Sequence, residues 1–486
     1  MGAPEGINKN WYGPICRDLL TGGAFIEEYR VTGTNHLLSS PFQVAILFMG
    51  AQSMKKFSTT ALALSSVFVL GLTGCGLNSG SDSAEANAAE GEVKGEITFS
   101  TLQLKPTFTD YIEGVIDDFE AENPGTTVKW IDIPFEGAQE KISTDAQADS
   151  LPDVVNLNPN FAQPLEEQGA FVNLEKAVPD LKDTYVEGAW DAFKVPGEEG
   201  SYGFPWYLSS EVTMYNKAMF EKAGLDPEQP PATYEELFNA ARTIKEKGGD
   251  IHGMHPALEN RFIPDLARLG VPLMNEDGTE WTFNTPEAEA YVQELADLYK
   301  EGVFPSDSLT QDHSKETEAY QAGQIALFPS GANFLSIIEE NAPDIAKATD
   351  VGPQITGDSG PTNVSVMGLL VPESSDNKAT ALEFAEYMTN AENQLEFSKI
   401  VTIFPSVTEA LEDPYFTDDS DGTVESKARR IAAEQLENAR NLVPVQFDDR
   451  VKSAVIGKIQ LALNGELTAS EALDQAVAEA NAITGK

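Results

Sequence analysis

The stretch from Tyr202 to Leu237, YGFPWYLSSEVTMYNKAMFEKAGLDPEQPPATYEEL, constrains the fold of this chain more than any other. Two large aromatic residues, Trp206 and Tyr207, stand directly after a proline. The segment from Val212 to Tyr215 then alternates in the way that predicts a β-strand. Because aromatic side chains next to a strand suit either a core or a ligand surface, this stretch sets both the fold and the candidate site.

Helix signals follow the strand in a fixed order. Asn216 is a preferred N-cap for a short helix from Lys217 to Ala223, and Gly224 suits the C′ position that ends it. A proline-rich run comes next, which cannot be helical throughout. Thr233 with Glu236 three residues later predicts a capping box at the start of another helix.

The preceding segment alternates between strand and helix patterns. The predicted strands are Lys94–Leu102, Thr127–Ile133 and Pro152–Asn158, and the predicted helices are Tyr111–Glu122 and Gly137–Ala148. Strands that alternate with helices predict a parallel sheet in an α/β domain, whose ligands gather where strands end in loops. Gln103, and Asn158 and Asn160 in a predicted polar loop, are therefore candidates to bind a polar ligand.

The rest of the chain also mixes helices and short strands. We expect strands at Gln324–Pro329 and Val364–Val371, a surface loop at Glu412–Asp421, and helices at Tyr234–Lys247, Pro286–Lys300, His313–Ala322, Lys378–Thr389, Glu425–Asn441, Asp449–Asn464 and Ala469–Ala482. No internal repeat is visible. The fold class expected from these patterns is α/β.

The central stretch resembles the family-1 extracellular solute-binding proteins of bacterial ABC importers, a group that includes maltose- and glycerol-phosphate-binding proteins. The matching segments are Tyr202–Pro205, Tyr215–Lys217, Phe220–Leu225 and Pro230–Leu237. The resemblance runs from about Gly95 to the C-terminus. It implies two α/β lobes (93–209 with 365–411, and 213–362 with 413–486), joined by three hinge crossings near Ser209–Val212, Ser365–Met367 and Leu411–Asp413. Ligand would lie in the cleft between the lobes, which would close by hinge bending.

Sugars need amide or carboxylate side chains for their hydroxyls and an aromatic plane for their C–H faces. Trp206 and Tyr207 can supply the plane, and Glu211 or Glu136 can accept from hydroxyls. The resemblance adds a loop with Gly331, Asn333 and Phe334, in which Asn333 stands where relatives often carry the aromatic residue, and the loop at Phe404. Each candidate also has a structural interpretation, with Trp206 as hinge core and each asparagine as a turn residue.

The net charge, the few histidines and the missing catalytic motifs argue against other classes of function. The chain of 486 residues has a formal net charge of -46, which repels nucleic acid and argues weakly against a strongly anionic ligand. The four histidines, His36, His252, His255 and His313, form neither an HExxH nor a zinc pattern, so we expect no metal site. No G-x-S-x-G elbow or P-loop is present, so we expect neither catalysis nor a cofactor.

The N-terminal region has the layout of a secretory signal. A basic start at Met54–Lys56 precedes the apolar run Ala61–Leu72, and Leu72–Cys75 resembles a bacterial lipobox. We therefore expect residues 54–74 to be removed and Cys75 to carry lipid. Residues 75–92 would form a lipidated tether with a span of roughly 23 Å. Residues 1–53 do not fit this layout and are interpreted as an upstream segment, which mass spectrometry of the mature protein would test.

The sequence thus predicts a monomeric lipoprotein, anchored outside the cytoplasmic membrane, that binds a sugar and delivers it to an ABC permease. One alternative is a glycerol-phosphate or other polar solute, because the loop Leu225–Pro231 is similar to the glycerol-phosphate branch. Lys105, Arg261 and Arg268 are the basic residues that such a ligand would need. A less favoured alternative is a secreted carbohydrate-active enzyme.

Overall fold

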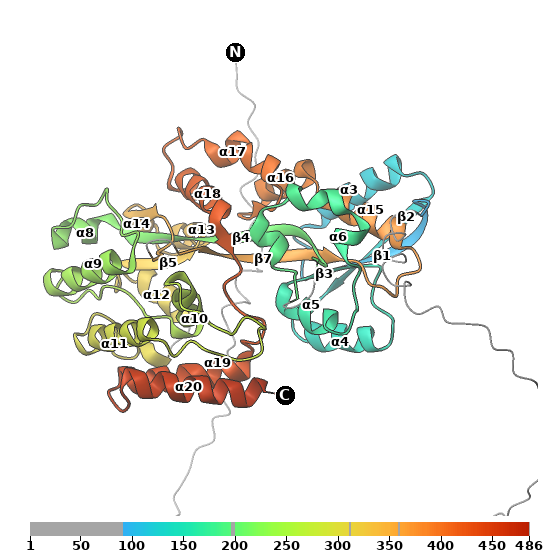
Figure 1. Ribbon diagram of the computed structural model, residues 1–486. Coiled ribbons are helices and arrows are strands. Elements are labelled where there is room, and N and C mark those ends of the chain that lie inside the picture. The colour runs from blue at the N-terminus through green and yellow to red at the C-terminus, as the bar shows by residue number, and fades with distance from the viewer. Residues whose placement is uncertain (1–90, 196–199, 311–312, 358–359, 486) are drawn as a thin grey trace, which may run out of the picture. The chain divides into compact units, whose positions relative to one another are not determined.

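The computed structural model describes residues 91–195, 200–310, 313–357 and 360–485, which lie in one compact unit, Ser79–Lys486 (Figure 1). Residues 1–53, the expected signal at 54–74 and Cys75 lie outside the described residues. The chain opens with three parallel strands in the order β2-β1-β3: β1 (Gly95–Leu102), β2 (Thr126–Ile133) and β3 (Val154–Leu157). Helices α3 (Thr109–Glu122) and α4 (Ala138–Gln147) connect them, so the predicted α/β class is confirmed.

The sheet continues through antiparallel strands. Its path is β2-β1-β3-β7-β4-β5, with β6, β8 and β9 paired beside it. These strands are β4 (Phe204–Asn216), β5 (Leu327–Gly331), β6 (Thr349–Gly352), β7 (Thr362–Leu370), β8 (Phe404–Pro405) and β9 (Ala439–Arg440). The long strand β4 passes through the middle of this arrangement (Figure 1) and connects its two parts.

Helices surround both parts of the sheet (Figure 1). The remaining ones are α5 (Pro159–Glu166), α6 (Leu174–Ala177), η1 (Pro179–Thr184), α7 (Glu187–Asp191), α8 (Lys217–Ala223), α9 (Tyr234–Lys247), α10 (Leu258–Arg268), α11 (Pro286–Lys300), η2 (Ser308–Thr310), α12 (His313–Gln321), α13 (Phe334–Asn341), α14 (Pro343–Ala346), α15 (Lys378–Met388), α16 (Ala391–Ile400), η3 (Thr408–Glu412), α17 (Pro414–Thr417), α18 (Val424–Gln435), η4 (Leu436–Asn438), α19 (Asp449–Leu463) and α20 (Ala469–Thr484). Among the described residues, no helix is both long and apolar enough to cross a bilayer.

The capping signals of the central stretch are confirmed. The Asn216 side chain accepts a hydrogen bond from the Met219 N–H at 3.1 Å, and Gly224 ends α8 with a φ of 75°. A residue with a Cβ is disfavoured at that positive φ, which explains the glycine. Thr233 and Glu236 form a reciprocal capping box, so α9 begins where the sequence indicated.

Three local predictions are wrong. Residues 158–161 were expected to form a loop, but Pro159 begins α5, because the Asn158 side chain caps the helix by accepting from the Phe161 N–H at 2.9 Å. The expected loop Glu412–Asp421 contains the short helix α17. The helix expected to reach Asn441 ends earlier, since residues 439 and 440 pair with β7.

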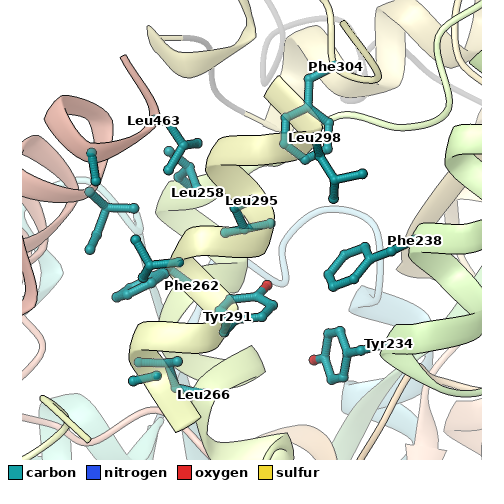
Figure 2. Close-up of a cluster of buried hydrophobic side chains, with 14 of the residues drawn as sticks. Tyr234, Phe238, Leu258, Phe262, Leu266, Tyr291, Leu295, Leu298, Phe304 and Leu463 are labelled. Carbon is teal, nitrogen blue, oxygen red and sulfur yellow. The ribbon is translucent and has the colours of Figure 1, made fainter. Parts of the chain in front are cut away.

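The buried apolar residues form three clusters. One lies around β1, β3 and α15, and a second runs through β4, β5 and α18. The third joins α9, α10, α11, α19 and α20, and Figure 2 shows Tyr234 and Phe238 of this cluster facing Tyr291. The rings of Tyr234 and Tyr291 meet edge to face at 5.6 Å. These cores hold the strand ends in fixed places, on which the site depends.

Candidate ligand-binding site

Strand β4 changes partners at its midpoint. Residues 204–210 pair with β7, whereas Glu211–Tyr215 pair with β5, so that Glu211 lies opposite Gly331. A strand that leaves one partner for another exposes polar backbone and side-chain groups at the exchange point. This point falls within the predicted crossing at Ser209–Val212, and Ser365–Met367 of β7 pairs beside it.

A hollow of about 220 Å³ opens at the exchange point. Its described lining residues come from β4, α10, β5, α13 and β7, and they are Ser209, Ser210, Glu211, Asn260, Arg261, Pro329, Ser330, Gly331, Phe334, Asn363 and Ser365. Most are hydroxyl, amide or carboxylate groups, and one is aromatic. Such a lining can donate to and accept from a polyhydroxylated compound while one ring covers an apolar face.

The arginine in this lining is already committed to protein groups. The Arg261 guanidinium donates to the buried carboxylate of Glu316 at 2.6 Å and to the carbonyl oxygens of His255 and Pro329. Burial opposes the charged form, but the carboxylates of Glu316, Asp265 and Glu211 raise the pKa of Arg261 above its ordinary value. Its charge is therefore neutralised within the protein.

A second buried arginine holds the carboxylate in the hollow. Arg268 donates to the Glu211 Oε2 at 2.7 Å, to the Asp265 Oδ1 at 3.0 Å and to the Gln354 Oε1 at 3.0 Å. The hydroxyls of Tyr234 and Tyr291 also donate to Asp265, at 2.7 and 2.6 Å. The Glu211 side chain, 36% exposed, is thus fixed in orientation with part of its surface toward solvent.

Gln354 links this ion pair to both strands at the exchange point. Its amide nitrogen donates to the Ser210 hydroxyl at 3.2 Å and to the Asn363 carbonyl at 2.9 Å, and its amide oxygen accepts from the Asn363 N–H at 2.9 Å. Buried polar groups that are satisfied in this way specify one arrangement, because breaking any one leaves others unpaired. The network therefore positions the polar floor of the hollow.

The predicted amides of the parallel strands lie at a different place, the carboxyl edge of β1 and β3. Gln103 and Asn160 are exposed, and Asn158 is half-buried as the N-cap of α5. Gln103 has a φ of 54°, a left-handed conformation that is uncommon without glycine and concentrates at functional sites. These residues border one strand edge but do not line the hollow.

The predicted aromatic residues of the crossing are largely buried. Trp206 is 0% exposed and stacks on Phe397 at 5.5 Å, with Tyr207 edge-on at 5.1 Å. Tyr207 is half-buried, and burial raises the pKa of its hydroxyl. Phe404 is also buried and packs against Phe416. In this structure Trp206 and Phe404 offer no surface to a ligand and have packing roles.

Three predicted residues do line the hollow, Glu211, Gly331 and Phe334. Asn333 lies between the last two in sequence and is exposed. Sequence reasoning did not include the serines, Asn260 and Asn363, which line the hollow, among the candidate ligand-binding residues. The strands that carry the serines and Asn363 were partly predicted, but helix α10, which carries Asn260, was not. Single serine and asparagine residues in these elements carry no periodic signal. The register of β5 and β7 against β4 brings the serines together.

A larger hollow of about 940 Å³ lies between α5 and the loops near residues 277 and 446. Gln163 of α5 and Glu167, directly after that helix, contribute from one side, and Thr279 and Gln446 contribute from the opposite elements. Half of its lining residues are acidic or amide side chains, and Arg450 is paired with Asp448 at 2.8 Å. This space is wide enough for a ligand longer than the first hollow holds.

Sequence comparison supplies an independent view. The family model described as bacterial extracellular solute-binding protein matches residues 105–395, more than half of the chain. An sn-glycerol-3-phosphate-binding periplasmic protein of Rhizobium meliloti is 25% identical over 317 residues, which cover 62% of this chain and 72% of that protein.

Solved structures share the fold. A protein of Synechococcus sp. MITs9220, provisionally described as an oligosaccharide periplasmic-binding protein, is 31% identical with a TM-score of 0.68, over 80% of this chain and 98% of that one. An ABC substrate-binding protein of Listeria monocytogenes, solved in complex with cycloalternan, is 25% identical with a TM-score of 0.61, over 81% of this chain and 99% of that one. The two-lobed fold expected from the sequence agrees with these neighbours.

Proposed function

Because this chain belongs to the bacterial extracellular solute-binding protein family, we propose that it captures a neutral sugar or oligosaccharide. It is the solute-binding component of an ABC importer, whose permease and ATPase are other chains. The hollow at the strand exchange supports a neutral, hydroxylated ligand, because serines, asparagines, Glu211 and Phe334 line it. The Synechococcus and Listeria neighbours point to the same ligand class.

The ion pair of Arg261 with the buried Glu316 is the observation that favours a sugar over glycerol phosphate. A phosphate needs an available guanidinium, ammonium or set of helix N-terminal amides. Arg261 and Arg268 are each held by buried carboxylates. Lys105 is exposed, with its ammonium 3.9 Å from the centre of the Trp130 ring, and it does not line the hollow. The -46 net charge adds a general repulsion for anions. Glycerol phosphate remains the second candidate because the Rhizobium relative is described as binding it.

Titration of the full chain with maltotriose, cellotriose and sn-glycerol 3-phosphate tests this proposal. We expect heat release and thermal stabilisation with a sugar, of about 2.7 kcal/mol at 100 times Kd, and none with the phosphate. The variant Ser365→Trp should abolish binding, because the exposed Ser365 side chain lines the hollow and a large ring there fills it. Thr127→Trp on the exposed face of β2 is the matched control and should bind normally.

Binding of the phosphate alone would replace the sugar by the second candidate. Normal affinity in Ser365→Trp would move the site away from this hollow. Chromatography of the recovered sugar addresses catalysis, since the family consists of binding proteins and the ligand should return unchanged. New reducing ends would instead indicate a hydrolase.

The remaining parts of the proposal concern assembly and location. We propose a monomer that acts outside the cytoplasmic membrane and is anchored by lipid on Cys75, with residues 54–74 removed as the signal. Two lobes, 93–209 with 365–411 and 213–362 with 413–486, would close on the ligand by bending at the crossings. The presence of a basic start, an apolar run and small residues before Cys75 supports the anchor.

A further inference from the structure

Phe135 is an unusually exposed aromatic residue. Its exposure is 54%, and it lies two residues after the end of β2. Its ring lies against that of Phe161 in the first turn of α5, with ring centres 6.0 Å apart and planes inclined by 28°. Two aromatic rings are thus layered at the surface, the inner one half-buried and the outer one open to solvent.

Core packing does not account for this ring. Among the described residues, only Ile131, Phe135 and Ile400 are large hydrophobic residues that remain exposed. The two isoleucines are isolated aliphatic side chains, which are ordinary on a protein surface. Phe135 differs because Phe161 supports its plane from below. Because the ring stays exposed, the unliganded protein does not obtain the full favourable free energy of burying it.

The pair also lies among polar groups at one edge of the sheet. Gln103 follows β1, Phe135 and Glu136 follow β2, and α5 follows β3, and these parallel strands end at the same edge. The Gln103 N–H donates to the Ile133 carbonyl at 2.9 Å, which joins the first two loops. Gln103, Glu136 and Asn160, at this same edge of the sheet, are exposed. An apolar plane with amide and carboxylate groups at its rim matches the two kinds of surface on a pyranose ring.

We propose that the Phe135–Phe161 pair is a stacking platform for the C–H face of one pyranose ring of the ligand. The exposed amide and carboxylate groups at its rim then receive that ring's hydroxyls. This inference rests on the proposed sugar-binding function and names a further contact surface at the carboxyl edge of the parallel strands, outside the lining of the hollow at the strand exchange. It also explains why Phe135 stays exposed, because its partner is the ligand.

The test uses the full chain titrated with maltotriose or cellotriose, whichever the wild-type protein binds more tightly. Phe135→Ala should weaken binding by about tenfold, the order expected for a lost aromatic contact. Phe135→Tyr should restore it, because tyrosine keeps the plane. Ile400→Ala removes a side chain of similar exposure, 55%, and should bind as the wild type does. Thermal unfolding without sugar should be nearly unchanged in all three variants.

The outcomes separate the two proposals. Wild-type affinity in Phe135→Ala, alongside a wild-type protein that binds sugar, contradicts the platform and leaves the proposed function standing. Equal losses in Phe135→Ala and Phe135→Tyr also contradict it, since a plane would then not suffice. If the wild-type protein binds neither sugar, the sugar-binding function fails and the platform fails with it.

Discussion

Trp206 shows that residue type alone does not distinguish a core residue from a ligand-binding residue. An aromatic side chain after a proline at a domain crossing suits a sugar site, yet this one is fully buried among Phe99, Tyr207 and Phe397. Strand alternation assigns residues to two faces but does not say which face is covered. In β4 both faces are covered around Trp206, so the pattern could not distinguish core from ligand surface.

We therefore expect Trp206→Ala to lower the free energy of unfolding and to leave the affinity for the ligand unchanged. Loss of a large buried ring costs about 3–5 kcal/mol of unfolding free energy. Urea denaturation measures this loss, and sugar titration well below the unfolding temperature measures the remaining affinity. Trp206→Phe is the control, because it keeps an aromatic ring and removes an indole N–H that has no hydrogen-bond partner among the described residues. If the Trp206→Ala variant were as stable as the wild type but did not bind sugar, the packing role would be contradicted and Trp206 would be a ligand-binding residue.

The individual site residues were predictable only in part. Glu211 and Phe334 were recognisable because each stands in a segment with its own signal, the strand before Asn216 and the glycine-containing loop. The serines of the hollow were not, because Ser209, Ser330 and Ser365 are far apart in sequence and meet only through strand register. Phe135 was missed because sequence periodicity does not report exposure.

At the scale of elements, Asp350 joins three parts of the fold. It lies on β6, accepts from the Lys427 ammonium of α18 at 2.7 Å and from the Tyr215 hydroxyl of β4 at 3.3 Å. Burial favours the neutral acid, but hydrogen bonds from Lys427 and the Val351 N–H, with the nearby lysine charges, hold the pKa of Asp350 below its ordinary value. The folded protein therefore favours the carboxylate more than the unfolded chain does.

This difference has a defined sign in pH. An acid whose pKa is lower in the folded state adds stability above its unfolded pKa of about 3.9, and the gain is lost as pH falls through the folded value. Asp350→Asn should cost about 1–3 kcal/mol near pH 7, the range for hydrogen bonds to charged groups. Its deficit relative to wild type should shrink below about pH 4. Urea denaturation of both proteins across pH measures the difference.

Asp344→Asn is the matched control for this prediction. Asp344 also pairs with a lysine, Lys347 at 2.8 Å, but its side chain is 94% exposed, so solvent screens the interaction. Its stability should differ little from wild type at any pH. A deficit in Asp350→Asn that stays constant from neutral to acid pH would show that the loss comes from packing and not from the charge.

Elements with strong local signals were predictable, and those set by distant contacts were not. The bounds of α8, α9 and α11 follow from caps and periodicity within the segments themselves. The start of α10 lacks such a signal, since it begins after Ala257 at a φ of 41° without a side-chain cap. Tertiary packing of Phe262 and Leu266 stabilises that helix instead, as Figure 2 shows for the cluster around them.

For the whole molecule, the family was recognisable from the single stretch Tyr202–Leu237. That stretch contains a strand, a short helix and a capped helix in the order that the family has at this crossing. The extent of the proposed closure did not follow, because a sequence pattern does not report distances across the larger hollow. Glu167, directly after α5, and Thr279 of the opposite loop line that hollow, and both are exposed. A ligand that contacts both sides stabilises the narrower form by its differential affinity for that form.

We expect spin labels on Glu167→Cys and Thr279→Cys to move closer when saturating sugar is added to the full chain, with Cys16 and Cys75 replaced by serine. Pulsed electron–electron double resonance would measure the distribution of distances between the two labels. A shift from mainly open to mainly closed requires roughly 10⁴-fold tighter binding to the closed form, so a partial shift reports a smaller difference. Labels on Glu167→Cys and Lys129→Cys are the control, because both lie on the parallel-strand side and should not move. An unchanged distribution at a sugar concentration that saturates binding would mean that this protein binds its ligand without closing.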